Sequence, residues 1–186
     1  MGDSWETIPD DARRFIEAQH VFFVASAPSG AGGRVNLSPK GLDTLRVLDE
    51  RTVAYLDFVG SGVETIAHLR DNARIVVMFC AFAGPPTIVR LHGRGEAVEP
   101  GDPRFESLAA RFPREPGVRS VILVHVERAS ESCGYGVPLY EYQGDRSQLG
   151  EWADRKGPDG LVAYQLERNR ESLDGLPALR ARTLEG

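Results

Sequence analysis

This sequence is poor in the features that mark membrane, disulfide-bonded and metal-binding proteins. Its 186 residues contain no apolar run near the 18 residues that a membrane span needs. The first residues, MGDSWETIPDD, are acidic where a secretory signal would be basic and then apolar. The two cysteines lie far apart, Cys80 in the apolar string IVVMFCAF and Cys133 in a glycine-rich turn, which argues against a disulfide or a metal site. We therefore predict a cytoplasmic protein without membrane contact and without a metal centre.

Clusters of basic residues are also missing. The formal net charge is −5, and the lysines and arginines are scattered among acids. A nucleic acid is therefore not an expected partner, whereas small solutes and protein surfaces remain candidates.

The chain is long enough for one well-filled core, and we predict a single domain over residues 1–186. Residues 1–130 would form the core with its helices. Residues 131–186 are rich in glycine and proline but contain Trp152 and four tyrosines. Such an aromatic segment favours packing over disorder, so we expect an extension that covers the core and the flank of a second subunit.

Strand patterns dominate residues 1–130. Runs rich in β-branched and aromatic residues, bounded by Gly, Pro, Asn and Asp, occupy residues 21–27, 34–39, 52–59, 73–82, 87–98 and 120–127. A proline and acidic residues at a helix start predict a helix at residues 9–20, and helical spacing predicts two more, at residues 61–72 and 102–112. For the second helix, Ser61 and Glu64 form a capping-box pattern at its start. We predict a mainly β, α+β protein in which six antiparallel strands close into a barrel.

The string RVNLSPKG, residues 34–41, carries an unusual polar row. Because side chains alternate along a strand, Arg34, Asn36 and Ser38 share one side, and Val35 and Leu37 are expected to face the core. Two interpretations are open: a solvated edge strand, or donors that line a groove for a flat polar ligand.

A second polar feature is the strand-to-helix junction at Gly60-Ser61-Gly62. Unhindered backbone N–H groups and a serine hydroxyl at a helix start can hold an anion, although ordinary capping by Ser61 explains the pattern equally well. The Glu64 carboxylate would repel an anion there unless a basic side chain offsets it. The candidates for that basic group are Arg34, Lys40 and Arg90.

A third polar row lies in TIVRLHGRGEAV, where Arg90, His92 and Arg94 alternate with apolar residues and glycine. Arg90 or Arg94 could hold a carboxylate or phosphate with two hydrogen bonds, or simply lie on the surface. For His68, His92 and His125 we expect packing or surface roles.

Standard catalytic signatures are lacking: the sequence has no Gly-x-Ser-x-Gly elbow, Walker loop, dinucleotide fingerprint or His-Glu-x-x-His motif. We predict no catalytic side-chain set, so a bound cofactor would supply the chemistry of an enzyme built on this chain.

Several strings in order support a family resemblance. FFVASA, GRVNLSPKG, VAYLDFVGSGVETIAHLRDNARIVVMF and IVRLHGRGEAV resemble the pyridoxamine 5'-phosphate oxidase-like family, whose members form an FMN-binding split β-barrel. SCGYGVP, the segment around Trp152 and NRESLDGLP resemble the C-terminal extension of one branch of that family. The resemblance implies a homodimer with FMN in a groove shared by the two subunits.

The resemblance also implies site residues. Arg34 falls where the family's phosphate-binding strand arginine is expected, but the helix start at residues 61–65 lacks the family's basic residues. Lys40 and the hydroxyls of Ser61 and Thr65 would then substitute, and Asn36 and Ser38 would meet the ring or ribityl chain. The complete set of expected cofactor-binding residues is Arg34, Asn36, Ser38, Lys40, Ser61, Gly62, Thr65 and Arg90.

The expected function is that of an FMN-dependent oxidoreductase acting on a small-molecule substrate. The C-terminal string LPALRARTLEG has no match to the family's Arg-x-His substrate motif, which argues against pyridoxamine 5'-phosphate oxidase activity itself. Two alternatives are open: a non-catalytic protein that binds flavin or haem, and a reductase that uses the deazaflavin F420.

Overall fold

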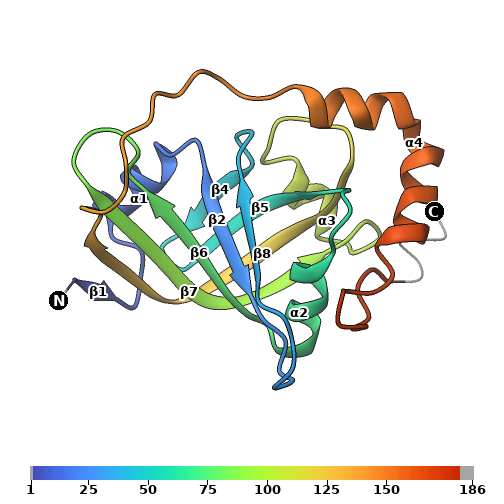
Figure 1. Cartoon of the computed structure of the whole chain (residues 1–186), viewed down its shortest axis with the longest axis horizontal. Coiled ribbons are helices and arrows are strands. Elements are labelled where there is room, and N and C mark those ends of the chain that lie inside the picture. The colour runs from blue at the N-terminus through green and yellow to red at the C-terminus, as the bar shows by residue number, and fades with distance from the viewer. Residues whose placement is uncertain (1, 181–186) are drawn as a thin grey trace.

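The computed structural model describes residues 2–180, which form an antiparallel sheet flanked by four helices (Figure 1). The strands lie in the order β3-β2-β6-β7-β8-β5-β4, and the short β1 pairs with β8 outside this path. The strands are β1 Ser4–Trp5, β2 Phe22–Ser26, β3 Asn36–Lys40, β4 Leu45–Asp49, β5 Thr52–Phe58, β6 Arg74–Cys80, β7 Thr87–Val98 and β8 Val118–Cys133. The helices are α1 Asp10–Glu17, α2 Glu64–Asn72, α3 Phe105–Ala109 and α4 Gln148–Arg168. The predicted α+β class with a mainly antiparallel sheet is confirmed.

The sheet contains two more strands, and one longer strand, than the sequence patterns predicted. All six predicted strands are present, but β1 and β4 were missed, and β8 continues to Cys133 because its polar second half pairs with the start of β7. The strand β4 is only five residues long and joins β5 through a two-residue turn. Among the described residues, β3 and β4 end the path without pairing to each other, so closure into a barrel stays a prediction.

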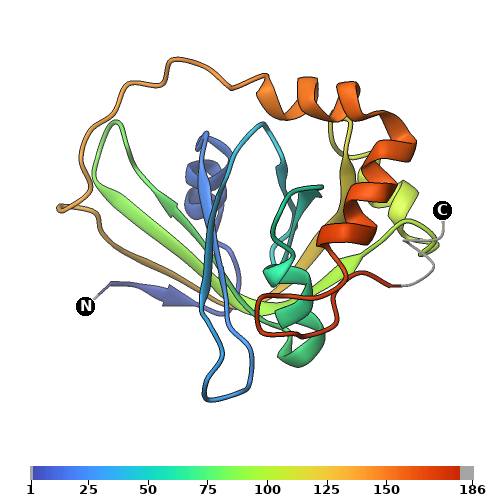
Figure 2. The same ribbon diagram turned by 45° about the vertical axis from the view of Figure 1, so that its right-hand side comes forward.

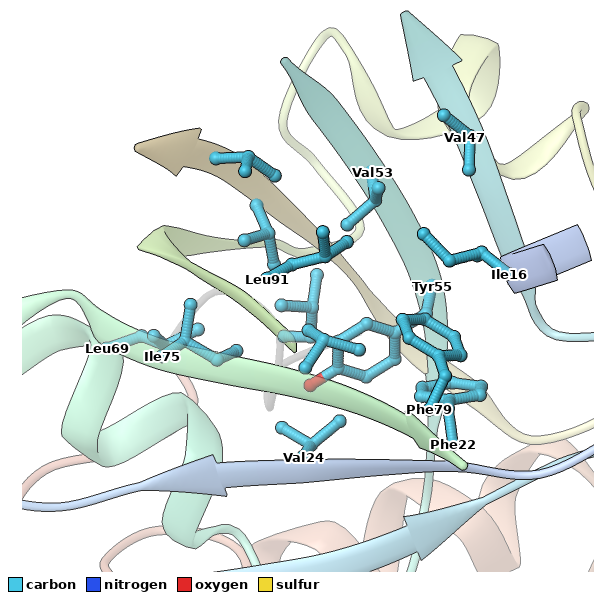
Figure 3. Close-up of a cluster of buried hydrophobic side chains, with 14 of the residues drawn as sticks. Ile16, Phe22, Val24, Val47, Val53, Tyr55, Leu69, Ile75, Phe79 and Leu91 are labelled. Carbon is cyan, nitrogen blue, oxygen red and sulfur yellow. The ribbon is translucent and has the colours of Figure 1, made fainter. Parts of the chain in front are cut away.

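The main hydrophobic core lies on the inner face of this curled sheet (Figure 3). Phe22 on β2 meets Tyr55 on β5 with ring centroids 5.5 Å apart and Phe79 on β6 at 6.0 Å. Because β2 and β5 are not neighbours in the sheet, this contact requires the inner face to turn upon itself. Burial of each large apolar side chain in this core stabilises the folded state by roughly 1.5–3 kcal/mol.

A second, smaller cluster covers the other face of β5, where Leu56 packs with Phe112. The helix predicted over residues 102–112 is shorter, since α3 spans only Phe105–Ala109. Phe105 and Leu108 still pack on this cluster, as their spacing predicted.

Helix α2 begins three residues later than predicted. Its first helical residue is Glu64, preceded by Val63, and no side chain caps its N-terminus, so the predicted Ser61–Glu64 capping box is wrong. The Glu64 carboxylate instead accepts a hydrogen bond from the backbone N–H of Leu173. The helix ends at Ala73, which adopts a left-handed conformation with φ of 62°.

Beyond β8 the chain crosses the molecule as an arch, residues 134–147, forms α4 and returns beside α2 (Figures 1 and 2). The arch touches the rest of the chain where Tyr140 N–H donates to the Phe82 carbonyl at 2.9 Å and Tyr142 stacks on His20 at 3.7 Å. Helix α4 is broken at Gly157, whose φ is 66°. None of the helices formed by residues 2–180 combines the length and apolar character that crossing a membrane requires.

Candidate functional site

The polar row of β3 faces inward, opposite to the predicted orientation. Asn36, Ser38 and Lys40 pair in register with Ser26, Val24 and Phe22, which are buried. Val35 and Leu37, expected in the core, are 74% and 63% exposed. The reason is the position of β3 at the sheet edge, where the inner side meets polar groups of α2 and β5 rather than core side chains.

Two members of the row bind each other and the start of α2. The Asn36 side-chain amide donates to Thr65 Oγ1 at 3.2 Å, and the Ser38 hydroxyl donates to Asn36 Oδ1 at 3.4 Å. Asn36 and Ser38 remain half-buried, and Thr65 is buried. The structure therefore brings together three of the predicted site residues.

Lys40, at the end of the row, joins a buried ion cluster that the sequence did not predict. Its Nζ lies 3.2 Å from Asp57 Oδ1, and Arg119 Nε donates to Asp57 Oδ2 at 2.6 Å. Burial alone would raise the pKa of Asp57, but Arg119 and then Lys40 outweigh it, so the pKa lies below its ordinary value. Two cations share one carboxylate, which leaves the cluster one positive charge in excess.

Arg119 also fixes the loop between β5 and α2. It donates to the Gly62 carbonyl at 2.8 Å and to Asn169 Oδ1 at 2.9 Å, while Asn169 Nδ2 donates to the Gly60 carbonyl at 2.9 Å. A signal for this cluster existed in the sequence. Asp57 and Arg119 are charged residues inside or beside strongly apolar strands, where burial requires a partner.

The chain's own C-terminal segment runs beside α2, from Glu64 at the helix start toward Asp71 near its end. The Asp174 carboxylate accepts hydrogen bonds from the Arg34 backbone N–H, at 2.7 Å, and from its guanidinium, and these bonds hold the pKa of Asp174 below its ordinary value. Leu173 N–H is held by Glu64. Ser61 and Gly62 are exposed beside this segment. An anion at the helix start would therefore meet the Glu64 carboxylate, and Arg34 is already bound to Asp174.

Arg90 does not join the row. It pairs in register with Met78, which pairs with Phe23, so it lies on the outer face of the sheet while Ser38 lies on the inner face. Its guanidinium donates to Ser132 Oγ at 3.0 Å. Arg90 and the β3 row cannot hold one ligand within a single chain.

The histidines have the structural roles that were expected. His68 is fully buried with Nδ1 2.9 Å from Ser26 Oγ, and His125 is exposed on β8. Both cysteines are free thiols. Among residues 2–180, no group of three His, Cys, Asp or Glu side chains is placed to hold a metal ion.

A groove opens where the polar row ends at Lys40. It has a volume of about 680 Å³ and lies between residues 20–21 and 39–42 on one wall and residues 144–152 on the other. Pockets for small ligands typically measure about 300–1,000 Å³. The β3 row, with hydrogen-bonding groups and an excess cation at its end, fits a planar ligand with an anionic group. The helix start fits a phosphate poorly, because it presents the Glu64 carboxylate while Arg34 is bound to Asp174.

Comparison with known proteins places the chain. A family model described as pyridoxamine 5'-phosphate oxidase matches residues 8–133. The pyridoxamine 5'-phosphate oxidase family protein ustO of Aspergillus flavus is 40% identical over 194 residues, covering 95% of this chain and 78% of ustO.

Solved structures share the fold. Two crystal structures of HupZ from Group A Streptococcus superpose with TM-scores of 0.55 and 0.52, at 24% and 26% identity. They cover 67% and 66% of this chain and 99% and 91% of their own. The chain belongs to the pyridoxamine 5'-phosphate oxidase family.

Proposed function

We propose that this protein is an FMN-dependent oxidoreductase that works as a homodimer on a small-molecule substrate. The observation that carries the proposal is the half-buried polar row of β3, which ends beside an ion cluster with one excess positive charge. Closure of the curled sheet into a split barrel is part of the same proposal, as is the cytoplasmic location.

The residues of the row would bind and orient the cofactor. Asn36, Ser38 and Thr65 offer hydrogen-bonding groups for the ring or ribityl chain, and Lys40 offers a charge. Arg34 would reach the phosphate beside Ser61 and Gly62 once Asp174 has left it. The flavin would supply the hydride chemistry, and the protein groups would fix its position and its access to the second reactant.

Binding is tested by titrating FMN into flavin-free protein and following the quenching of flavin fluorescence. Ser38→Ala should weaken FMN binding by about 0.5–1.5 kcal/mol, the usual contribution of one hydrogen bond. Ser132→Ala is the matched control, because Ser132 bonds Arg90 on the outer face of the sheet. Equal effects of the two variants would remove the β3 row from the cofactor site.

Turnover separates an enzyme from a binding protein. An absorbance spectrum of the purified protein, with mass analysis of the released ligand, distinguishes FMN, F420 and haem. Reduction of bound flavin by NADPH without oxygen, followed by reoxidation at a useful rate, would support the oxidoreductase. A tightly held flavin that neither step changes would favour the non-catalytic alternative.

A further inference from the structure

The groove at Lys40 is formed by two parts of the chain, of which the family model matches only one. One wall, residues 20–21 and 39–42, lies within the region that the family model matches, residues 8–133. The other wall, residues 144–152, lies outside that match. The groove is therefore a feature that the extension adds to the family core.

The arch residues 134–147 position the second wall. Tyr142 stacks on His20 with an interplanar angle of 3°, and Tyr140 is bonded through its backbone to Phe82. Residues 144–149 follow directly and enter the first turn of α4. The rings of Phe82 and Tyr140 form a second aromatic contact, with their centroids 5.6 Å apart. Together with the Tyr142–His20 stack, this contact holds the second wall opposite Lys40.

The charges of the groove favour an anion. Lys40 and Arg146 line it together with one acid, Asp145, which gives a formal lining charge of +1 with His20 neutral. The partner of Lys40 does not cancel this charge, because Asp57 is already shared with Arg119. A ligand with a single negative charge would balance the groove.

Apart from Gln148, the other side chains that line the groove are flat or apolar. Pro39, Leu42, Leu149 and Trp152 line the groove, and apolar surface makes up most of its lining. Such surfaces bind the faces of aromatic rings, which bury much area at little entropic cost.

The turn beneath the groove is strained. Leu42 and Asp43 adopt left-handed conformations, with φ of 63° and 50°. A left-handed backbone is unfavourable for a residue with a Cβ, because the Cβ comes too close to the following carbonyl oxygen. Thr44 Oγ1 donates to the Gly41 carbonyl at 2.5 Å, and Arg46 pairs with Asp43, so local contacts hold the turn against this cost. Strain that surrounding contacts maintain is frequent at ligand sites.

We propose that this groove binds a small aromatic molecule with one negative charge, such as an aryl carboxylate, beside the flavin and without displacing it, with Lys40 at the border of the two sites. If the proposed function holds, this molecule is the second reactant, and that assignment alone rests on it. The binding itself needs only the groove.

The test is calorimetric titration of flavin-free protein with 2-naphthoate and with its neutral amide, 2-naphthamide. We expect 2-naphthoate to bind at least about tenfold more tightly than 2-naphthamide, and Arg146→Met and Lys40→Met each to weaken it by about tenfold. Arg94→Met is the matched control, since Arg94 lies on β7 away from the groove, and should leave binding unchanged. Lys40→Met removes one partner of Asp57, so thermal melts are used to check that this variant folds. If Lys40→Met does not fold, the Arg146→Met variant alone decides whether the groove binds the anion.

Flavin provides the second arm. Saturating FMN should leave the affinity for 2-naphthoate unchanged or higher if the two sites are separate. Equal binding of the two probes, unchanged binding in Arg146→Met, or competition by FMN would overturn the proposal. Failure of the FMN titration alone would refute the proposed function and leave the groove standing.

Discussion

At the scale of single residues, the clearest feature is a carboxylate held between two cations. Asp57 is buried on a strand whose neighbours are apolar, and its two partners come from distant parts of the chain, Lys40 on β3 and Arg119 on β8. A buried charge is tolerated only when it is paired and hydrogen-bonded. The cluster therefore links the edge strand β3, the strand β5 and, through Asn169, the C-terminal segment.

Asp57→Asn should destabilise the fold strongly. The amide would leave Arg119 buried without a counter-charge, and breaking a buried pair in this way costs about 3–5 kcal/mol in the free energy of unfolding. Urea denaturation measures it. Asp154→Asn, at an exposed position of α4, is the control and should change stability little. A loss no larger than that of the control would mean that the cluster is solvated in solution.

The same residue predicts a pH dependence. The pKa of Asp57 is lower in the folded protein than the value of about 3.9 for an unfolded chain. Its contribution is therefore fully present above pH 4 and is lost as the pH falls through the folded pKa. The difference in unfolding free energy between wild type and Asp57→Asn should shrink from pH 6 to pH 3. A constant difference over that range would contradict the lowered pKa.

Ala73 offers a stabilising substitution. It ends α2 in a left-handed conformation that costs a residue with a Cβ roughly 1 kcal/mol and costs glycine almost nothing. Ala73→Gly should therefore raise the free energy of unfolding by about 0.5–1 kcal/mol. The matched control is Ala18→Gly, since Ala18 ends α1 with an ordinary φ of −87° and should gain nothing. Thermal or urea unfolding compares the two variants.

At the scale of elements, strand patterns predicted the sheet but not the orientation of its edge strand. Alternation identified β3 correctly as a strand with one polar side. The assumption that Val35 and Leu37 face the core failed, because partners for Asn36 and Lys40 come from α2 and β5, which alternation along one strand cannot reveal. The cluster around Asp57 was missed for the same reason, since its members are 17 and 62 positions apart.

The start of α2 likewise depends on a distant segment. A local capping box was predicted, but Glu64 binds Leu173, more than a hundred residues away. Local sequence patterns could not predict the pairing of Arg34 with Asp174 either, because the two residues are 140 positions apart. For His68, the sequence left a packing and a surface role open; the structure shows it fully buried and bonded to Ser26, so its replacement would damage the core.

Asp174→Asn tests whether the C-terminal segment competes with an anion for Arg34. The amide keeps an acceptor for the Arg34 backbone N–H but removes the negative charge beside the guanidinium. FMN should then bind severalfold more tightly, and the gain should shrink in high salt because the Arg34 side chain is 68% exposed. The control is Asp159→Asn on α4, an exposed acid, which should leave FMN affinity unchanged. Unchanged affinity in Asp174→Asn would mean that the FMN phosphate is not held by Arg34.

At the scale of the whole molecule, large apolar side chains are exposed on several segments, and most of them lie on β3 with its preceding residue and on the arch. The outward side of β3 presents Val35 and Leu37, and the arch presents Tyr135, Leu139 and Tyr140, which are 84%, 75% and 66% exposed. The ribbons of the arch and of α4 stand away from the sheet (Figure 2). Apolar groups that one chain leaves exposed are typical of surfaces that a second copy covers.

The homodimer can be tested on that surface. Sedimentation at micromolar concentration should give about twice the chain mass of 20.4 kDa. Leu37→Lys should shift the protein toward the monomer, because it would bury an unpaired ammonium group in the interface. Leu173→Lys is the matched control, since Leu173 is 77% exposed but lies on the C-terminal segment beside α2. If Leu37→Lys remains dimeric while folding normally, the partner covers the arch instead of β3. A wild-type monomer would exclude a cofactor groove shared between subunits and would leave the β3 row and the Asp57 cluster to hold the flavin within one chain.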